Sequence, residues 1–295
     1  MFKLTLCFLL LASASAFAKR EAIKCLPGNQ PSDLPSEYLN GCETMDYFTS
    51  CLKILGSSAS SSEINSCKNI RNTFALGCVK TLGSSIDTSE LNSCAKIDNF
   101  YSYKGVVSLG SSASSSEINA ISKMTNANQQ SCLSVLGSSA DTSEINSCAL
   151  FTSTKEGSYY SIQCVKTLGR SATASEISNC NSITNEHSLT VVKLIGSSID
   201  TSELRYAAGI TTSLQSECAK ILGSSIDSSE IASCARINNV FSLEAIRAVG
   251  SSITSSEITS ALDINNEYEL ACVKVLGSYA DNSEIRACNF PDTLE

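Results

Sequence analysis

Residues 78–94 read CVKTLGSSIDTSELNSC, and most of the chain consists of variations on this stretch. A glycine that follows Leu, Ile or Val recurs nine times, with a spacing of 27 residues everywhere except for one spacing of 32. A glutamate stands seven residues after each of these glycines. Nine copies of one supersecondary unit therefore fill residues 45–290, with no linker between them. The glycines are Gly56, Gly83, Gly110, Gly137, Gly169, Gly196, Gly223, Gly250 and Gly277.

Each unit contains the start signal of a helix. Four residues after the glycine stands Ser, Thr or Asp in every unit, and the glutamate follows three residues later, as Asp87 and Glu90 do in the opening stretch. This is the spacing of a capping box, in which each of the two side chains accepts a hydrogen bond from the other residue's backbone N–H. Ile86 and Leu91 flank the box as a hydrophobic staple does. A helix is therefore predicted to begin at each box, over about residues 88–97 in the second unit.

A second helix precedes each glycine. In most units an asparagine, such as Asn266, stands where it can cap this helix, and the following segment EYELACVKVL has one apolar face. The glycine itself is predicted to end the helix in a left-handed conformation. Helices of about ten residues are marginal alone, so the hairpins must stack on one another. The predicted fold is all-α: an α-solenoid of nine 27-residue αα-hairpin repeats.

Other repeat architectures fit less well. A leucine-rich-repeat horseshoe allows a 27-residue unit, but its LxxLxL strand signature is absent and two capped helices leave no room for a strand. The period is shorter than those of tetratricopeptide, ankyrin and HEAT units.

The cysteines follow the repeat. In six units a cysteine stands five residues before the glycine and another eleven residues after it, and in the other three units both are lost together, as in Gly105/Ile121, Val191/Ala207 and Ala245/Ala261. Joint presence or absence predicts a disulfide inside each hairpin, which the usual distance between packed helices permits. The predicted bonds are Cys51/Cys67, Cys78/Cys94, Cys132/Cys148, Cys164/Cys180, Cys218/Cys234 and Cys272/Cys288, with Cys25/Cys42 left as a seventh pair.

The first residues predict export. Lys3, an apolar run over residues 4–12 and the ending AFA at residues 16–18 make residues 1–18 typical of a secretory signal peptide. Lys19 and Arg20 then are either two charges behind the signal or a processing site. Residues 19–44 are predicted to form an N-terminal cap and residues 291–295 a short tail. Cys7 lies within the predicted signal, so 14 of the 15 cysteines remain in the exported chain. An even number of cysteines in an exported chain favours disulfides, so the protein is predicted to be secreted and extracellular.

Composition and motifs exclude several classes of function. Without Lys3 the chain has 20 basic and 29 acidic residues, a balance that disfavours nucleic acid and anionic membranes as partners. No segment after the signal approaches the length of a membrane span. No CxxC pair and no GxSxG motif occur, and His187 is the only histidine, so no metal, cofactor or catalytic triad is predicted. The repeated glutamates are explained as caps. We therefore expect a non-enzymatic protein.

Two features are candidates for binding. Seven units carry a cation three residues before the glycine, a row that an anionic polymer such as an acidic polysaccharide fits, although a cation there also stabilises the helix dipole. The five extra residues of the long unit predict a projecting loop over residues 152–160, with Tyr159 and Tyr160 as contact residues. The row comprises Lys53, Lys80, Lys166, Lys193, Lys220, Arg247 and Lys274.

These features leave two expectations for function. The first is a scaffold that binds an extracellular protein or glycan through its curved face or through the loop of residues 152–160. The second is a self-associating structural component of an extracellular matrix or coat.

Overall fold

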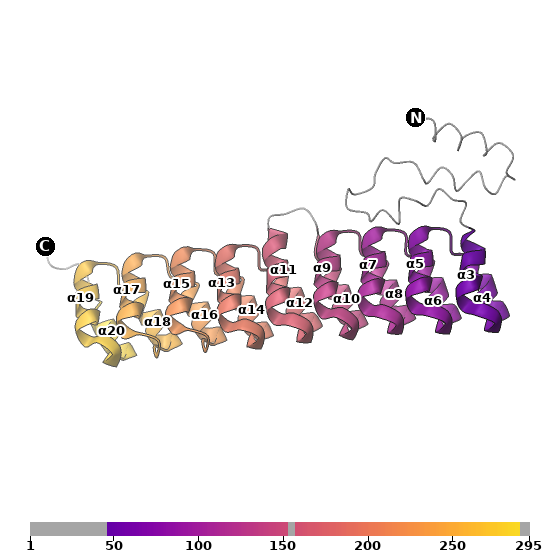
Figure 1. Ribbon diagram of the computed structural model, residues 1–295. Coiled ribbons are helices and arrows are strands. Elements are labelled where there is room, and N and C mark those ends of the chain that lie inside the picture. Colours follow the sequence, from indigo (N-terminus) through magenta and orange to yellow (C-terminus); the bar gives the residue numbers. More distant parts are fainter. Residues whose placement is uncertain (1–45, 153–156, 290–295) are drawn as a thin grey trace, which may run out of the picture. The chain divides into compact units, whose positions relative to one another are not determined.

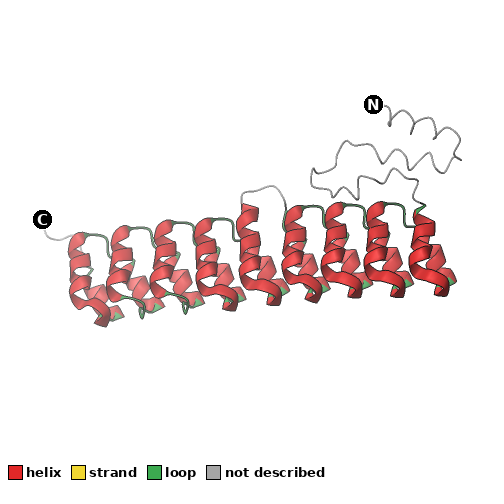
Figure 2. Ribbon diagram, viewed as in Figure 1, coloured by secondary structure: helices red, strands yellow, loops and turns green. Residues whose placement is uncertain are grey.

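The computed structural model describes residues 46–152 and 157–289 of the chain. The predicted signal peptide (residues 1–18), the N-terminal cap with Cys25 and Cys42 (residues 19–44) and the tail (residues 291–295) lie outside the described residues. Within them the regular structure is helical throughout, with eighteen α-helices and no strand (Figure 2). The predicted all-α repeat fold is confirmed.

The described chain divides at residues 98 and 99 into two compact units. The first contains two hairpins, and the second contains seven. In every hairpin the odd-numbered helix comes first, and we call it the A helix; the even-numbered helix that follows is the B helix. The helices of the first unit are α3 (Tyr47–Leu55), α4 (Ser61–Cys67), α5 (Thr73–Leu82) and α6 (Thr88–Cys94).

In the second unit the hairpins stack side by side. The A helices lie in one layer and the B helices in another, and each helix contacts the next helix of its own layer (Figure 1). The helices are α7 (Phe100–Leu109), α8 (Ser115–Ile121), α9 (Ala127–Leu136), α10 (Thr142–Cys148), α11 (Gly157–Leu168), α12 (Ala174–Cys180), α13 (Glu186–Ile195), α14 (Thr201–Ala207), α15 (Ser213–Leu222), α16 (Ser228–Cys234), α17 (Val240–Val249), α18 (Ser255–Ala261), α19 (Glu267–Leu276) and α20 (Asn282–Ala287).

All nine B helices begin with the predicted capping box. At α6, the Glu90 N–H donates to Asp87 Oδ1 at 2.8 Å, and the Asp87 N–H donates to Glu90 Oε2 at 2.9 Å. The B helices are shorter than expected. For example, α6 ends at Cys94, whereas the sequence predicts a helix to about residue 97. The predicted last residue, Ile97, instead belongs to a tighter turn in which its N–H donates to the Cys94 carbonyl at 3.0 Å.

The A helices end at the repeated glycine as predicted, but its backbone conformation differs in one angle. Gly83 has φ 81° and ψ −160°, so its φ is positive while its ψ lies far from that of a left-handed helix. This region is open to glycine and essentially to no other residue. The unusual ψ turns the chain directly into a short 3₁₀ turn, η5 (Gly83–Ser85), before the next cap.

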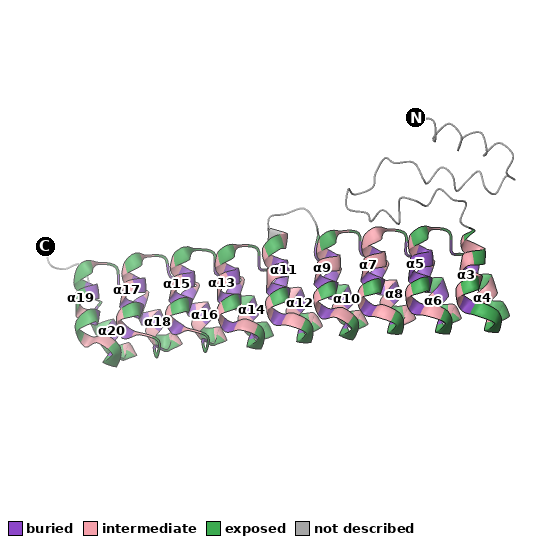
Figure 3. Cartoon of the chain, viewed as in Figure 1, coloured by how far each residue is buried: buried purple, intermediate pink, exposed green. Residues whose placement is uncertain are grey.

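The six disulfides of the described residues are the six intra-hairpin pairs that the sequence predicts. Their Cα–Cα distances are 5.5 to 5.8 Å. The third hairpin has Gly105 and Ile121 at the two cysteine positions, and the Ile121 side chain fills the space of the missing bond. A Cβ added at Gly105 would lie only 2.7 Å from Ile121 Cγ2. The cysteines and their replacements are buried, except for the half-buried Cys272, and the disulfides join the two helices of a hairpin. Figure 3 shows how buried and exposed residues are distributed over the helices.

A second link inside the hairpins is a buried polar residue eight positions before the glycine. Ser188 Oγ donates to the Ile210 carbonyl at 2.7 Å, and Gln129 Nε2 donates to the Ala149 carbonyl at 2.6 Å. Each bond joins the start of an A helix to the turn that follows its B helix. Such a hydrogen bond closes this end of the fourth to eighth hairpins, and in six units a disulfide joins the middle of the hairpin.

Candidate functional site

The cation row lies on the exposed side of consecutive A helices. In the second unit Lys166, Lys193, Lys220, Arg247 and Lys274 all stand in the last turn of their helices, α11 to α19, and all five are exposed. Because neighbouring A helices pack against one another, the row has a spacing of about 10 Å. In the first unit Lys53 and Lys80 hold the same position in α3 and α5 and are also exposed.

The five cations of the second unit differ in their electrostatic surroundings. Lys220 donates to Glu217 Oε1 at 2.6 Å within its own helix, and Arg247 pairs with Glu244 in the same way. The other three make no ion pair or hydrogen bond within residues 46–152 and 157–289: Lys166, Lys193 and Lys274. These three have the charge most available to a ligand.

The position of the row also has a purely structural consequence. A cation in the last turn of a helix interacts favourably with the partial negative charge of the unpaired carbonyls, by about 0.3–1 kcal/mol at an exposed site. Each lysine therefore stabilises its A helix whether or not it binds a partner. The third and fourth hairpins have Val107 and Ser134 at this position, so the cation is not required for the hairpin to form.

The tyrosines of the long unit lie on a helix, so the predicted loop is wrong over residues 157–160. Helix α11 has 12 residues against ten in α9, and its two extra residues precede Tyr159. Part of the insertion has thus extended the helix. Residues 153–156, the rest of the expected loop, lie outside the described residues. Tyr159 is 62% exposed and packs edge to face on Tyr160, with ring centroids 5.4 Å apart.

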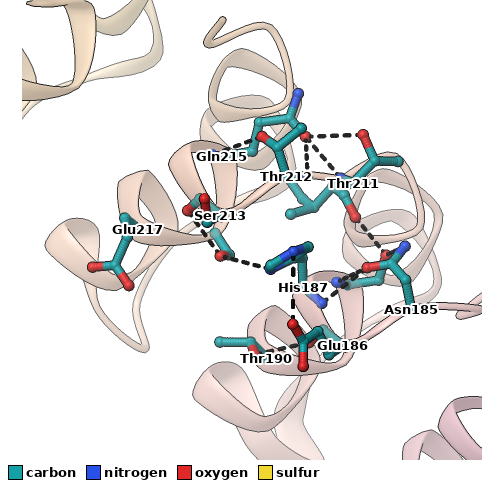
Figure 4. Close-up of polar contacts among 12 residues, drawn as sticks. Asn185, Glu186, His187, Thr190, Thr211, Thr212, Ser213, Gln215 and Glu217 are labelled. Carbon is teal, nitrogen blue, oxygen red and sulfur yellow. Dashed lines mark hydrogen bonds and ion pairs between the residues drawn. The ribbon is translucent and has the colours of Figure 1, made fainter. Parts of the chain in front are cut away.

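The single histidine lies in a polar cluster between α13 and α15 (Figure 4). His187 Nδ1 is 3.5 Å from Ser216 Oγ, and His187 Nε2 is 3.9 Å from Glu186 Oε1. This order of groups resembles a catalytic triad, but Ser216 is only 3% exposed and its hydroxyl donates to the Ser213 carbonyl at 3.0 Å. A buried hydroxyl in that position cannot meet a substrate. The cluster joins two neighbouring hairpins.

No group of three or more His, Cys, Asp or Glu side chains within residues 46–152 and 157–289 is placed to hold a metal ion. None of the helices described there has the length and apolar character needed to cross a membrane.

Comparison with protein-family models, with curated protein sequences and with solved structures gave no match to this chain.

One surface that sequence reasoning missed lies at the end of the second unit. Tyr268, Val275 and Tyr279 on α19 and the following turn are 85%, 86% and 92% exposed. A signal for part of it was present in the sequence: Tyr268 and Val275 are apolar residues at positions that are half-buried in the preceding hairpin, where Phe241 and Ala248 stand.

Proposed function

We propose that this chain is a secreted, non-enzymatic repeat scaffold that binds an acidic extracellular glycan through the cation row of its A helices. The observation that carries the proposal is the register of five exposed cations on consecutive helices, three of them without an acidic partner. A glycan chain with regularly spaced anionic groups meets such a row at several points, and the weak single contacts add up through effective concentration. An acidic extracellular protein is the other partner that this chemistry accepts.

Secretion is part of the proposal and is supported by two features. Six disulfides within the described hairpins require an oxidising compartment to form and persist, and residues 1–18 have the pattern of a signal peptide. Expression in a secreting host, followed by N-terminal sequencing of protein from the medium, tests it. We expect the exported chain to start at Lys19, or after Arg20 if the dibasic pair is processed. Retention of the intact chain inside the cell would contradict export.

The row is tested by removing its three unpaired charges. We expect the variant Lys166→Gln/Lys193→Gln/Lys274→Gln to elute from an acidic-glycan column at clearly lower salt than the native chain, because exposed charge contacts are screened by salt. A control variant with the same change of net charge replaces exposed cations outside the row: Lys123, Arg205 and Arg236, each by Gln. Equal elution of both variants would remove the row as a binding site.

The inserted residues before the tyrosine pair are a separate candidate contact, which is tested by restoring the repeat length. Deleting residues 153–157 places Ser158 two residues after Phe151, the spacing that caps the A helix in other units, as in Ile70 and Asn72. We expect the Cys164–Cys180 bond to form normally and the elution from the glycan column to be unchanged. Loss of glycan binding in this variant would shift the site from the row to residues 152–160.

A further inference from the structure

The ninth hairpin ends in an apolar surface that no other described residue covers. Two of its side chains are the exposed Tyr268 and Val275, and Ala271 and Ala287 are exposed beside them. None of the four carries a charge. We call these four residues the end face.

In preceding hairpins the same positions are covered. In the eighth hairpin Phe241 and Ala248, which correspond to Tyr268 and Val275, are half-buried, and Ser260, which corresponds to Ala287, is 1% exposed. The cover is the ninth hairpin itself, because α17 packs on α19 and α18 packs on α20. The end face is thus the surface that a hairpin presents to its successor.

The end face also lacks the features of a terminal cap. Repeat arrays that end in solution need a polar outer face on the last repeat. Here the position of Ala271 holds Glu217 in the seventh hairpin and Glu244 in the eighth, so the last hairpin is less polar at this position than the two that precede it.

The opposite surface of the first hairpin is also incompletely covered. Phe48, Leu52 and Ile64 are half-buried. Their counterparts in the second hairpin, on which the first hairpin packs, are completely buried: Ala75, Val79 and Leu91. These three partly exposed residues of α3 and α4 lie on the side that a preceding hairpin contacts elsewhere in the chain.

We propose that the end face binds the first hairpin of a second copy of this chain, so that copies associate head to tail. A second copy is the occupant because the chain already uses this interface internally. Within each unit, the positions of the end face in one hairpin pack against the opposite side of the next hairpin, never against another end face. The contact is therefore heterologous, and it leaves a free end face on the second copy. Association continues into linear oligomers. This inference does not depend on the cation row.

The test uses the full exported chain and two blocked variants. The end-face variant carries Tyr268→Lys and Val275→Glu, and the head variant, altered in the first hairpin, carries Phe48→Lys and Leu52→Glu. Sedimentation velocity as concentration rises is expected to show a growing mass for the native chain. Each variant alone is expected to remain monomeric, with a dissociation constant raised by about 30-fold or more. An equimolar mixture of the two is expected to stop at a dimer, because one intact head and one intact end face remain.

Several outcomes would overturn the proposal. The native chain remaining a monomer at every concentration is one, and a head variant that still associates is another, since it points to a symmetric contact between two end faces. Association that appears only after deletion of residues 290–295 would assign the end face to the chain's own tail, and association that appears only after deletion of residues 19–44 would assign the surface of the first hairpin to the predicted N-terminal cap. Helicity and the Cys51–Cys67 and Cys272–Cys288 bonds are measured in both variants to show that they fold. The triple lysine variant is expected to associate like the native chain.

Discussion

The aspartate that caps α16 connects a single side chain with the stability of a helix. Asp227 accepts a hydrogen bond from the Ser229 hydroxyl at 2.7 Å and another from the Glu230 N–H at 2.9 Å. These bonds, the hydroxyl first, lower the pKa of the Asp227 carboxyl from its ordinary value. A lowered folded-state pKa contributes stability that is present above the unfolded value of about 3.9 and is lost as the pH falls through the folded-state value.

We therefore predict different pH profiles for two substitutions at this cap. Asp227→Ala should lower the free energy of unfolding by about 1 kcal/mol at pH 7, because it leaves an N–H of the first turn without its partner. Asp227→Asn keeps a capping oxygen, so it should leave the free energy of unfolding nearly unchanged at pH 7. As the pH falls from about 5 to about 2, the Asn variant should lose less stability than the native chain, because it has no capping carboxylate to protonate. Urea unfolding across this range checks both. Parallel profiles for Asn and Asp would contradict the role of the charge.

A buried glutamate gives a second prediction at this scale. Glu269 is 3% exposed, and its Oε2 accepts from the Asn265 N–H at 2.6 Å. Gln215 occupies the same position in the seventh hairpin, where its Oε1 accepts from the Thr211 N–H and its Nε2 donates to the Ala235 carbonyl at 2.6 Å. A carboxylate has no such donor. Glu269→Gln should therefore raise the free energy of unfolding by about 1 kcal/mol.

The reciprocal change supplies the control for this prediction. Gln215→Glu should lower stability by at least as much, because it removes a donor from a buried carbonyl. Both values come from urea unfolding at pH 7. A stabilising Gln215→Glu would show that the hydrogen bond to the carbonyl is not what decides the preference.

The sequence allowed prediction of the caps but not of these buried polar residues, and the reason is physical. A capping box is local, since Asp87 and Glu90 meet within one helical turn. The buried position is filled by residues as different as Ser188, Gln129 and Glu269, and the carbonyls to which Ser188 and Gln129 donate lie 22 and 20 residues away. Only the packing of the hairpin reveals what these residues share.

At the scale of the helices, the eighth hairpin tests how the disulfides act. Ala245 and Ala261 are fully buried at the two cysteine positions, and in six other hairpins the corresponding Cα atoms lie 5.5 to 5.8 Å apart. The variant Ala245→Cys/Ala261→Cys is expected to form a seventh bond among the hairpins and to gain about 2–3 kcal/mol, less any cost of packing two sulfur atoms. Non-reducing peptide mapping and unfolding in urea measure both effects.

The single variant Ala245→Cys is the control for the double variant. It should leave one free thiol and show no gain in the free energy of unfolding, and a reductant should abolish the gain of the double variant. The third hairpin does not offer the same experiment, because a Cβ at Gly105 meets Ile121 at 2.7 Å. A double variant that retains two free thiols would mean that the helices of the eighth hairpin lie farther apart than those of its neighbours.

Helix positions were predictable because each begins with a strong local signal, while the ends and the insertion were not. The predicted second helix, residues 267–276, coincides with α19. The B helices end early because their last residues take up a tighter turn that packs Ile97 into the core. The insertion carries no helix-breaking proline, and Gly157 and Ser158 extended α11 instead of forming a loop.

At the scale of the whole chain, stability depends on which helices contact one another. The main contacts within each unit join the two helices of a hairpin or neighbouring hairpins. Stability in such an array is approximately a sum of hairpin terms and nearest-neighbour terms. The period in the sequence predicts this arrangement. It does not predict the division at residues 98 and 99, because the 27-residue spacing continues across that point unchanged.

The nearest-neighbour character leads to a prediction for a shortened chain. A fragment of residues 99–295 retains seven complete hairpins, all contacts of the second unit and the bonds Cys132–Cys148, Cys164–Cys180, Cys218–Cys234 and Cys272–Cys288. We expect it to be helical by circular dichroism and to form these four disulfides. The slope of its unfolding free energy against urea concentration should be smaller than that of the full chain. This slope scales with the surface exposed on unfolding, and fewer hairpins bury less surface.

A fragment of residues 113–295 is the matched comparison. It lacks α7, which leaves α8 without the other half of its hairpin and exposes Ile118, a residue that is fully buried in the intact unit. The 113–295 fragment should be less stable than the 99–295 fragment, because the cut through a hairpin destroys a hairpin interface and exposes apolar surface. Equal stability of the two fragments, or an unfolded 99–295 fragment beside a folded full chain, would show that the hairpin is not the unit of stability.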